Sequence, residues 1–224
     1  MNFVSWAFVA LFAITLLARL TIGRRKVEPA YTVVLIVAST VFYAWHIPVY
    51  LGILALSTGV DYVAARWLEA MPGHATARRK AVLVASLGTN LGLLGFFKYA
   101  DFLLQAIRDV APGLSADLPP ELALALPMGI SFYTFQSMSY TIDVYRGQLR
   151  AVDSFWRFYL FVVFFPQLVA GPIVRALEFI PQMPRPRRIR AAVWYEGAWL
   201  IINGFFLKMV CADNLAVYVD EHWE

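Results

Sequence analysis

The sequence contains few charged residues and almost no cysteine. Asp, Glu, Lys and Arg make up 15% of its 224 residues, whereas soluble domains contain about 25%. The one cysteine, Cys211, cannot form an internal disulfide and excludes a four-cysteine metal site. Signature motifs of serine hydrolases, phosphate-binding loops and zinc proteases are also absent. We therefore expect no soluble enzyme of these classes, no metal site and no nucleic-acid partner.

Hydrophobic residues are in large excess. They make up 60% of the chain, compared with about 45–50% in soluble domains. Aromatic residues contribute 16%, as is typical where Trp and Tyr anchor at membrane interfaces. A soluble core of this size could not bury so much apolar surface. The composition predicts an all-α, polytopic integral membrane protein.

Six apolar segments have about the length that a helix needs to cross ~30 Å of hydrocarbon. Residues 29–60 contain no charged side chain and are too long for one helix, so we divide them at His46-Ile47-Pro48. The whole chain is interpreted as one transmembrane domain. The predicted spans are 3–22, 31–45, 49–65, 81–97, 122–142 and 191–212.

A seventh apolar segment, 158–174, has basic residues on both sides, Arg157 before it and Arg175 after it. Basic residues favour the cytoplasmic side, so both ends are expected there. Pro166, Gly171 and Pro172 would interrupt a helix. We predict a re-entrant hairpin, with an ordinary kinked span as the alternative.

Charge distribution predicts the orientation of the spans. Basic clusters occur at residues 24–26, 66–80 and 185–190, whereas residues 101–121 and the tail after Cys211 are acidic. Placing the N-terminus outside brings all three basic clusters to the cytoplasm. The positive-inside rule therefore favours an N-terminus outside.

The fifth span carries a polar stripe. Gly129, Tyr133, Gln136, Tyr140 and Asp143 recur at helical spacing, and a lipid-facing helix would not carry them. The stripe either bonds to other helices or lines a hydrated cavity, and the sequence leaves both open. The candidates for a substrate channel, in this stripe and in the re-entrant segment, are Tyr133, Gln136, Tyr140, Gln167 and Arg175.

A catalytic base is harder to find. His46, His74 and His222 have no adjacent carboxylate and no metal-ligand spacing, so we interpret each as a solvated histidine. Gln167 could orient a thioester or a backbone carbonyl, or it could hold the hairpin closed. Arg175 could meet an anionic donor or serve only as an orientation charge.

Two long motifs resemble those of the membrane-bound O-acyltransferase family. They are PMGISFYTFQSMSYTIDVYRG, residues 127–147, and FFPQLVAGPIVR, which contains Phe165–Arg175. Supporting similarity extends over FYAWHIPVYLGILALSTGVDY and NLGLLGFFKYADFLL. The resemblance is strongest to bacterial members that acetylate exported polysaccharides such as alginate.

The resemblance implies acyl transfer in the bacterial inner membrane. The donor would be acetyl-CoA or another acyl thioester in the cytoplasm, with no bound cofactor. The acceptor would be an exported polysaccharide or a periplasmic relay protein. The family's catalytic histidine has no counterpart here, so we expect it beyond Glu224 and interpret the chain as an N-terminal fragment. A transporter or flippase, or a scaffold subunit of an export complex, are the alternatives.

Overall fold

The fold was determined as a computed structural model, which describes residues 5–22, 28–45, 47–73, 75–110, 122, 125–168, 171–172, 174–183 and 190–223. Among these residues every regular element is a helix, as predicted, and no strand is present. The chain forms two compact units, residues 1–185 and 186–224, and each is described by itself.

Unit 1 consists of eight α-helices and one short 3₁₀-helix among the described residues. Their bounds are α1 Trp6–Ile22, α2 Glu28–Ala44, α3 Tyr50–Ala70, α4 Thr76–Val110, α5 Ile130–Tyr145, α6 Phe155–Val163, α7 Phe165–Leu168, α8 Ala176–Phe179 and the 3₁₀-helix Ile180–Gln182.

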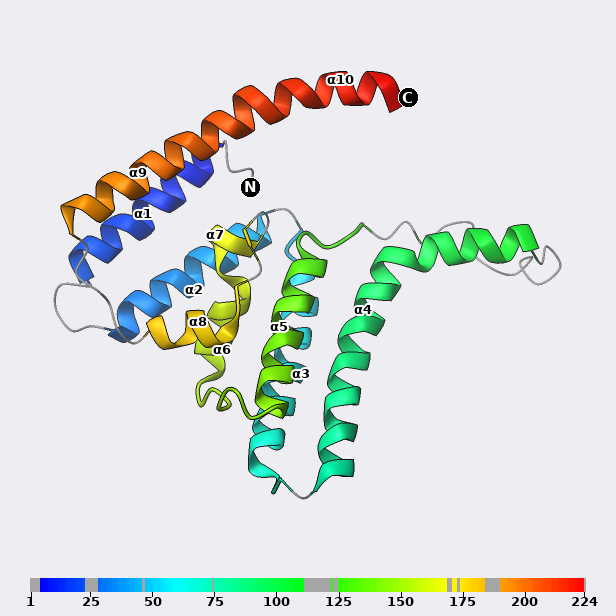
Figure 1. Ribbon diagram of the computed structural model, residues 1–224. Coiled ribbons are helices and arrows are strands. Elements are labelled where there is room, and N and C mark those ends of the chain that lie inside the picture. The colour runs from blue at the N-terminus through cyan, green and yellow to red at the C-terminus, as the bar shows by residue number, and fades with distance from the viewer. Residues whose placement is uncertain are drawn as a thin grey trace. The chain divides into compact units, whose positions relative to one another are not determined.

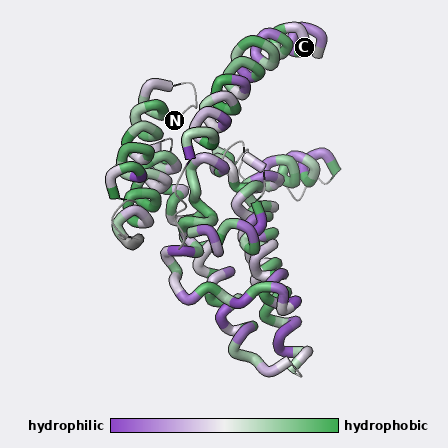
Figure 2. Tube along the Cα trace, turned by 60° about the vertical axis from the view of Figure 1, so that its left-hand side comes forward, coloured by the Kyte–Doolittle hydropathy of each residue, from purple (hydrophilic) through white to green (hydrophobic). Residues whose placement is uncertain are grey.

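The core of unit 1 is built mainly from α3, α5 and α6. The helices α3 and α4 form a hairpin, and α5 packs beside both of them (Figure 1). The short helices α6 and α7 pack against α2, and α6 also contacts α3 and α5. Hydrophilic residues gather around the turn of the α3–α4 hairpin (Figure 2), which is where the sequence predicts a cytoplasmic loop.

Two predicted spans in unit 1 differ in extent from the helices that contain them. The span 81–97 lies within one helix of 35 residues, Thr76–Val110, which bends in its second half (Figure 1). The fifth span begins at Ile130 and not at Leu122. Pro127 lies before it, and Gly129 has a left-handed φ of 71°, which ends any continuous helix at that point.

The segment predicted as re-entrant is an interrupted helix. Its first part begins at Phe155, three residues before the predicted boundary, and a break at Phe164 separates α6 from α7. Pro166 does not cause the break by itself, because it lies in the first turn of α7, where a missing N–H is tolerated. Whether the segment enters and leaves on one side of a membrane stays a prediction.

Unit 2 is one helical rod, and none of its residues 190–222 is buried. It consists of α9 Ala191–Phe206, a π-helical stretch Leu207–Ala212 and α10 Asp213–Trp223. The rod continues beyond the predicted end at Ala212. In it, Lys208 forms an ion pair with Asp213 across the π-helical stretch.

Two helical stretches are long and apolar enough to cross a membrane, Thr76–Val110 and Ala191–His222. The apolar helices Trp6–Ile22 and Ala30–Ala44 are shorter.

Candidate functional site

The polar stripe of α5 faces the interior of unit 1. Tyr133, Gln136, Tyr140 and Asp143 are at most 3% exposed, whereas Phe135 on another face is 46% exposed. The stripe packs against α3, α4 and α6, and the ring of Tyr133 meets Tyr43 of α2 edge-on. The stripe therefore packs on neighbouring helices, and the Tyr133 hydroxyl and Oδ2 of Asp143 have no hydrogen-bond partner among the described residues.

Gln136 and Gln167 converge on one backbone oxygen. Their Nε2 atoms donate to the carbonyl oxygen of Phe161 at 2.7 Å and 3.0 Å respectively. Phe161 lies in the last turn of α6, where carbonyls have no partner within the helix. The two carboxamides thus supply the hydrogen bonds that the interrupted helix lacks. This contact joins the two motifs that carry the family resemblance.

The other side of the break is also satisfied by the protein. The backbone N–H of Phe165, the first residue of α7, donates to Oγ of Ser39 on α2 at 3.3 Å. The ring of Phe165 packs against Phe8 of α1 and Phe42 of α2. A broken helix is tolerated at membrane depth only when protein or a hydrated cavity satisfies its backbone, and here protein does so.

Two glycines permit the close packing of α7. A Cβ atom added to Gly129 would lie 2.8 Å from the carbonyl oxygen of Leu168, the last residue of α7. A Cβ atom added to Gly171 would lie 2.5 Å from Cα of Gln167. Because both distances are too short for a real contact, these positions require glycine.

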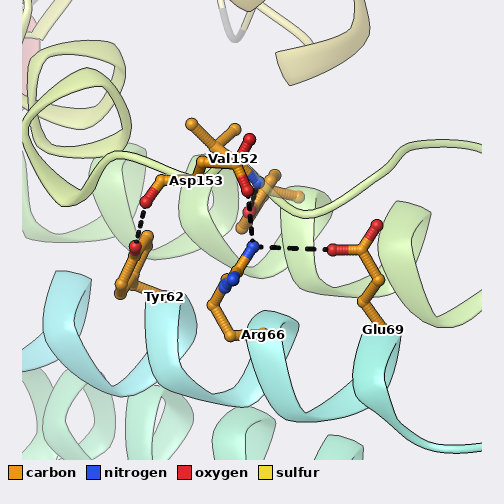
Figure 3. Close-up of polar contacts among 6 residues, drawn as sticks. Tyr62, Arg66, Glu69, Val152 and Asp153 are labelled. Atoms are coloured by element: carbon orange, nitrogen blue, oxygen red, sulfur yellow. Dashed lines mark hydrogen bonds and ion pairs between the residues drawn. The ribbon is translucent and has the colours of Figure 1, made fainter.

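Tyr140 attaches the loop before α6 to α5, and Tyr62 and Arg66, labelled in Figure 3, attach it to α3. The Tyr140 hydroxyl accepts from the backbone N–H of Val152 at 2.9 Å, and its ring lies 4.3 Å from that of Phe158. The same loop is tied to α3 because Nη1 of Arg66 lies 2.7 Å from Oδ1 of Asp153 and the hydroxyl of Tyr62 donates to the carbonyl of Asp153 at 2.6 Å.

Arg175 does not join this group. It lies at the N-terminus of α8 and is exposed, and its side chain makes no ion pair with another described residue. The other four candidates lie on α5 and α7, and three of them, Gln136, Gln167 and Tyr140, hold the interrupted helix and its preceding loop.

A second polar cluster escaped the sequence analysis. Asp61 of α3 is fully buried, and its Oδ1 accepts from Nδ2 of Asn90 at 2.8 Å and from the hydroxyl of Ser86, both on α4. The hydroxyl of Ser57 donates to Oδ1 of Asn90. A signal was present in the sequence, since Ser57 and Asp61, and likewise Ser86 and Asn90, are four residues apart in apolar helices.

Two hollows in unit 1 lie apart from the five channel candidates. A groove of about 540 Å³ between α3 and α4 is lined by mostly apolar residues that include Gly59, Val63, Trp67 and Ser86. A cavity of about 160 Å³ is lined by Tyr43, Ile47, Tyr50, Leu126 and Met128. None of the five channel candidates lines either of them, so their role in a channel stays a prediction.

The histidines give no catalytic arrangement in the part of the chain that is described. His46 and His74 lie outside the described residues. His222 is exposed, with Nδ1 3.0 Å from the carbonyl oxygen of Tyr218 in its own helix. No group of three or more His, Cys, Asp and Glu side chains in the described ranges could hold a metal ion.

Comparison with known proteins places these motifs in a family. The chain is 36% identical over 189 residues to the "probable alginate O-acetylase AlgI" of Pseudomonas putida, which covers 83% of this chain. It is 32% identical over 212 residues to the "peptidoglycan O-acetyltransferase" of Helicobacter pylori, again covering 83% of the chain. The chain belongs to the membrane-bound O-acyltransferase family.

The chain is also similar, at lower identity, to a protein named for D-alanyl transfer instead of acetyl transfer. The "teichoic acid D-alanyltransferase" of Bacillus subtilis is 28% identical over 123 residues, which cover 53% of this chain and 31% of that protein. No family model matches the chain, and no solved structure matches it.

The chain spans 38% of the length of the Pseudomonas putida relative and 39% of that of the Helicobacter pylori relative. Membership of the membrane-bound O-acyltransferase family, together with the apolar helices, identifies a membrane protein.

Proposed function

We propose that this protein takes part in the transfer of an acetyl group across the bacterial inner membrane. The donor is a cytoplasmic acyl thioester, acetyl-CoA or another, and the acceptor is a hydroxyl on the outer side. The acceptor hydroxyl belongs to an exported polysaccharide or to a periplasmic relay protein. The observation that carries the proposal is the similarity to relatives named for O-acetyl transfer, at 32–38% identity over most of the chain.

In the proposed reaction the C–S bond of the thioester breaks and a C–O ester bond forms. The hydroxyl proton leaves through a base and ends on the released thiol, so atoms and charge balance. The family resemblance implies a histidine as this base, and neither His46, His74 nor His222 has the sequence context that it requires. We assign no bond-making role to the five candidate residues.

The interrupted helix has a place in this proposal. Donor and acceptor are separated by ~30 Å of hydrocarbon, and a segment that enters and returns would thin this barrier locally. The proposed topology has six spans, one re-entrant segment over 158–174 and an N-terminus outside. The hydrogen bonds of Gln136 and Gln167 to Phe161 support it, because they supply partners that lipid cannot offer.

The functional test uses the gene of this protein in its complete reading frame. We would express it in a bacterium that lacks its own alginate O-acetylase and measure polymer acetylation by NMR. The double variant Gln136→Ala/Gln167→Ala should lower acetylation at least tenfold at equal membrane abundance. Gln182→Ala is the matched control, because the Gln182 amide also donates to a carbonyl but is exposed.

Acetylation by wild type that does not exceed that of the empty vector would refute the acyl-transfer proposal. Full acetylation by the double variant would mean that the two glutamines serve only in packing and are not needed for acetyl transfer.

The topology test uses single cysteines in a Cys211→Ser background. Gln148 and Glu178 flank the interrupted helix and are exposed, so cysteines there are open to reagent. Labelling of both from the cytoplasm is expected for a re-entrant segment. Labelling from opposite sides would make it an ordinary kinked span.

A further inference from the structure

The Asp61 cluster contains an acceptor atom without a donor. Oδ1 of Asp61 accepts two hydrogen bonds from α4, whereas Oδ2 has no partner among the residues that the structure describes. The residue is 0% exposed, so water at the surface of the chain does not reach it. A buried carboxylate oxygen that lacks a partner is costly in any protein and more so in a membrane.

On α5, the hydroxyls of Ser137 and Thr141 lie within hydrogen-bonding reach of the Asp61 carboxylate. The Ser137 hydroxyl donates to the carbonyl of Thr134 at 3.2 Å, and the Thr141 hydroxyl donates to the carbonyl of Ser137 at 3.4 Å. In these bonds both hydroxyls present lone pairs toward the carboxylate, whereas a rotated hydroxyl would donate to it instead. With the hydroxyls bonded to their own helix, Oδ2 of Asp61 and these two oxygens face one another with no donor between them.

Arg78 and Lys80, in the first turns of α4, are exposed, and three other cationic side chains of the surrounding helices are engaged elsewhere. Arg66 of α3 pairs with Asp153, and Arg79 of α4 donates to the carbonyls of Leu68, Met71 and Tyr145. The side chain of Lys98 lies over the ring of Tyr99.

The other titratable groups of these helices are also directed away from Asp61 or placed at the helix ends. Tyr62 donates to the Asp153 carbonyl, and Tyr140 accepts from Val152. Asp143 lies in the last turn of α5, and Glu69 is in the last turn of α3, 3.8 Å from Arg66. Among the described residues, no side chain thus supplies the positive charge that would balance Asp61.

We propose that Asp61 is the binding site of one monovalent cation, a proton or a sodium ion, enclosed by α3, α4 and α5. The cation lies between Oδ2 of Asp61 and the hydroxyl oxygens of Ser137 and Thr141. A proton on Oδ2 would donate to one of these hydroxyls, whereas a sodium ion would take all three oxygens as ligands, the atom type that hard cations prefer. Either cation converts three facing acceptors into an attractive contact.

Such a site would couple ion binding to helix packing. Its ligands come from α3 and α5, and Asn90 and Ser86 of α4 fix the orientation of the carboxylate. Loss of the cation leaves a bare carboxylate between the helices, which favours their separation. The inference does not depend on the acyl-transfer proposal, because it rests on burial and hydrogen-bond geometry alone.

Two measurements on the purified chain in detergent distinguish the two cations. Infrared spectroscopy detects the carbonyl stretch of a protonated carboxylic acid. If the cation is a proton, this band is present in wild type, lost in Asp61→Asn and retained in Asp143→Asn. Asp143→Asn is the matched control, because Oδ2 of Asp143 is also buried without a partner among the described residues.

If the cation is sodium, the band is absent and the melting temperature depends on the salt. We then expect wild type to melt about 2–4 °C higher in sodium chloride than in choline chloride of equal ionic strength, with no such difference in Asp61→Asn. A spectrum without an Asp61 band together with equal melting in both salts would refute the site. It would mean that an ionised Asp61 is held by rotated hydroxyls alone.

A second variant covers the case in which Asp61→Asn does not fold. Thr141→Val keeps the shape of the side chain and removes one of the three oxygens. It should shift the infrared band or lower the apparent sodium affinity several-fold. A Thr141→Val protein that matches wild type in band position and in salt response would also contradict the proposal.

Discussion

The two buried polar clusters of unit 1 differ in how fully their hydrogen-bond acceptors are satisfied. Around Phe161, two neutral carboxamides satisfy one carbonyl that a helix break has freed. Around Asp61, a carboxylate gathers donors from α4 and still retains one oxygen without a partner. The first cluster is closed, since its two side-chain amides satisfy a backbone carbonyl at the end of α6. The second is open, since one oxygen of its central carboxylate has no partner among the described residues.

This difference separates structural from functional polarity in a membrane protein. A polar residue that completes backbone hydrogen bonding stabilises an irregular segment and needs no ligand. A buried ionisable residue without a counter-charge is costly, and its presence in an apolar helix points to a function. The largest effects on stability should therefore come from the Asp61 cluster and the smallest from polar contacts at the surface.

Removing the carboxylate should have the largest effect. In Asp61→Leu, the Ser86 hydroxyl loses its acceptor and the Asn90 amide keeps only the Ser86 carbonyl, while both side chains remain buried. Buried polar groups without partners cost about 1–3 kcal/mol each, so we expect a loss of about 2–4 kcal/mol in the free energy of unfolding. Unfolding by SDS in mixed micelles measures it.

The same experiment on Asp153→Leu provides the control, because Asp153 also carries a carboxylate in unit 1 but its side chain is 94% exposed. Equal stability of Asp61→Leu and wild type would remove the distinction between the open and the closed cluster.

The Phe161 cluster should show strong non-additivity. Gln136→Ala and Gln167→Ala each leave the Phe161 carbonyl with one donor, so each single variant should lose about 0.5–1.5 kcal/mol. The double variant leaves the carbonyl with none and should cost about 1 kcal/mol more than the sum. A double-mutant cycle measures this coupling, with Gln182→Ala as the exposed amide control. Strict additivity would show that the two glutamines act separately.

Gly129 tests how closely α7 must pack on the start of α5. Gly129→Ala introduces a Cβ atom 2.8 Å from the Leu168 carbonyl, at a φ of 71°. Gly147 has nearly the same φ, 72°, but open space around it, so Gly147→Ala reports the backbone strain alone. The strain costs about 1–2 kcal/mol, and the Gly129 variant should exceed it by a further ~1 kcal/mol or more. Equal thermal stability of the two variants would mean that α7 moves without cost.

Much of the Phe161 cluster could be foreseen from sequence. Tyr133, Gln136 and Tyr140 lie close together in one apolar segment, so their shared face follows from helical periodicity alone. Periodicity also separates them from Phe135, which is exposed. It could not reveal that Gln136 and Gln167 share one acceptor, because that contact depends on where α6 ends.

The Asp61 cluster was missed because its residues are divided between two helices. Ser57 and Asp61 form one pair and Ser86 and Asn90 another, and neither pair is dense enough to mark a polar face. The two pairs form a hydrogen-bonded cluster only because the α3–α4 hairpin brings them together. The start of α5 was misplaced for a related reason, since hydropathy does not register the left-handed turn at Gly129.

The contact of Arg66 with Asp153 should have the smallest effect. It has short geometry, 2.7 Å from Nη1 to Oδ1, but the two side chains are 43% and 94% exposed. Exposed ion pairs contribute about 0–1 kcal/mol, because water and salt screen them. We therefore expect Arg66→Gln to cost less than about 1 kcal/mol, and that cost should vanish at high salt. Tyr62→Phe removes the uncharged bond to the same Asp153 and should be insensitive to salt. A large, salt-independent loss in Arg66→Gln would instead mean that this loop is enclosed in the membrane protein, and that its ion pair belongs with the buried clusters.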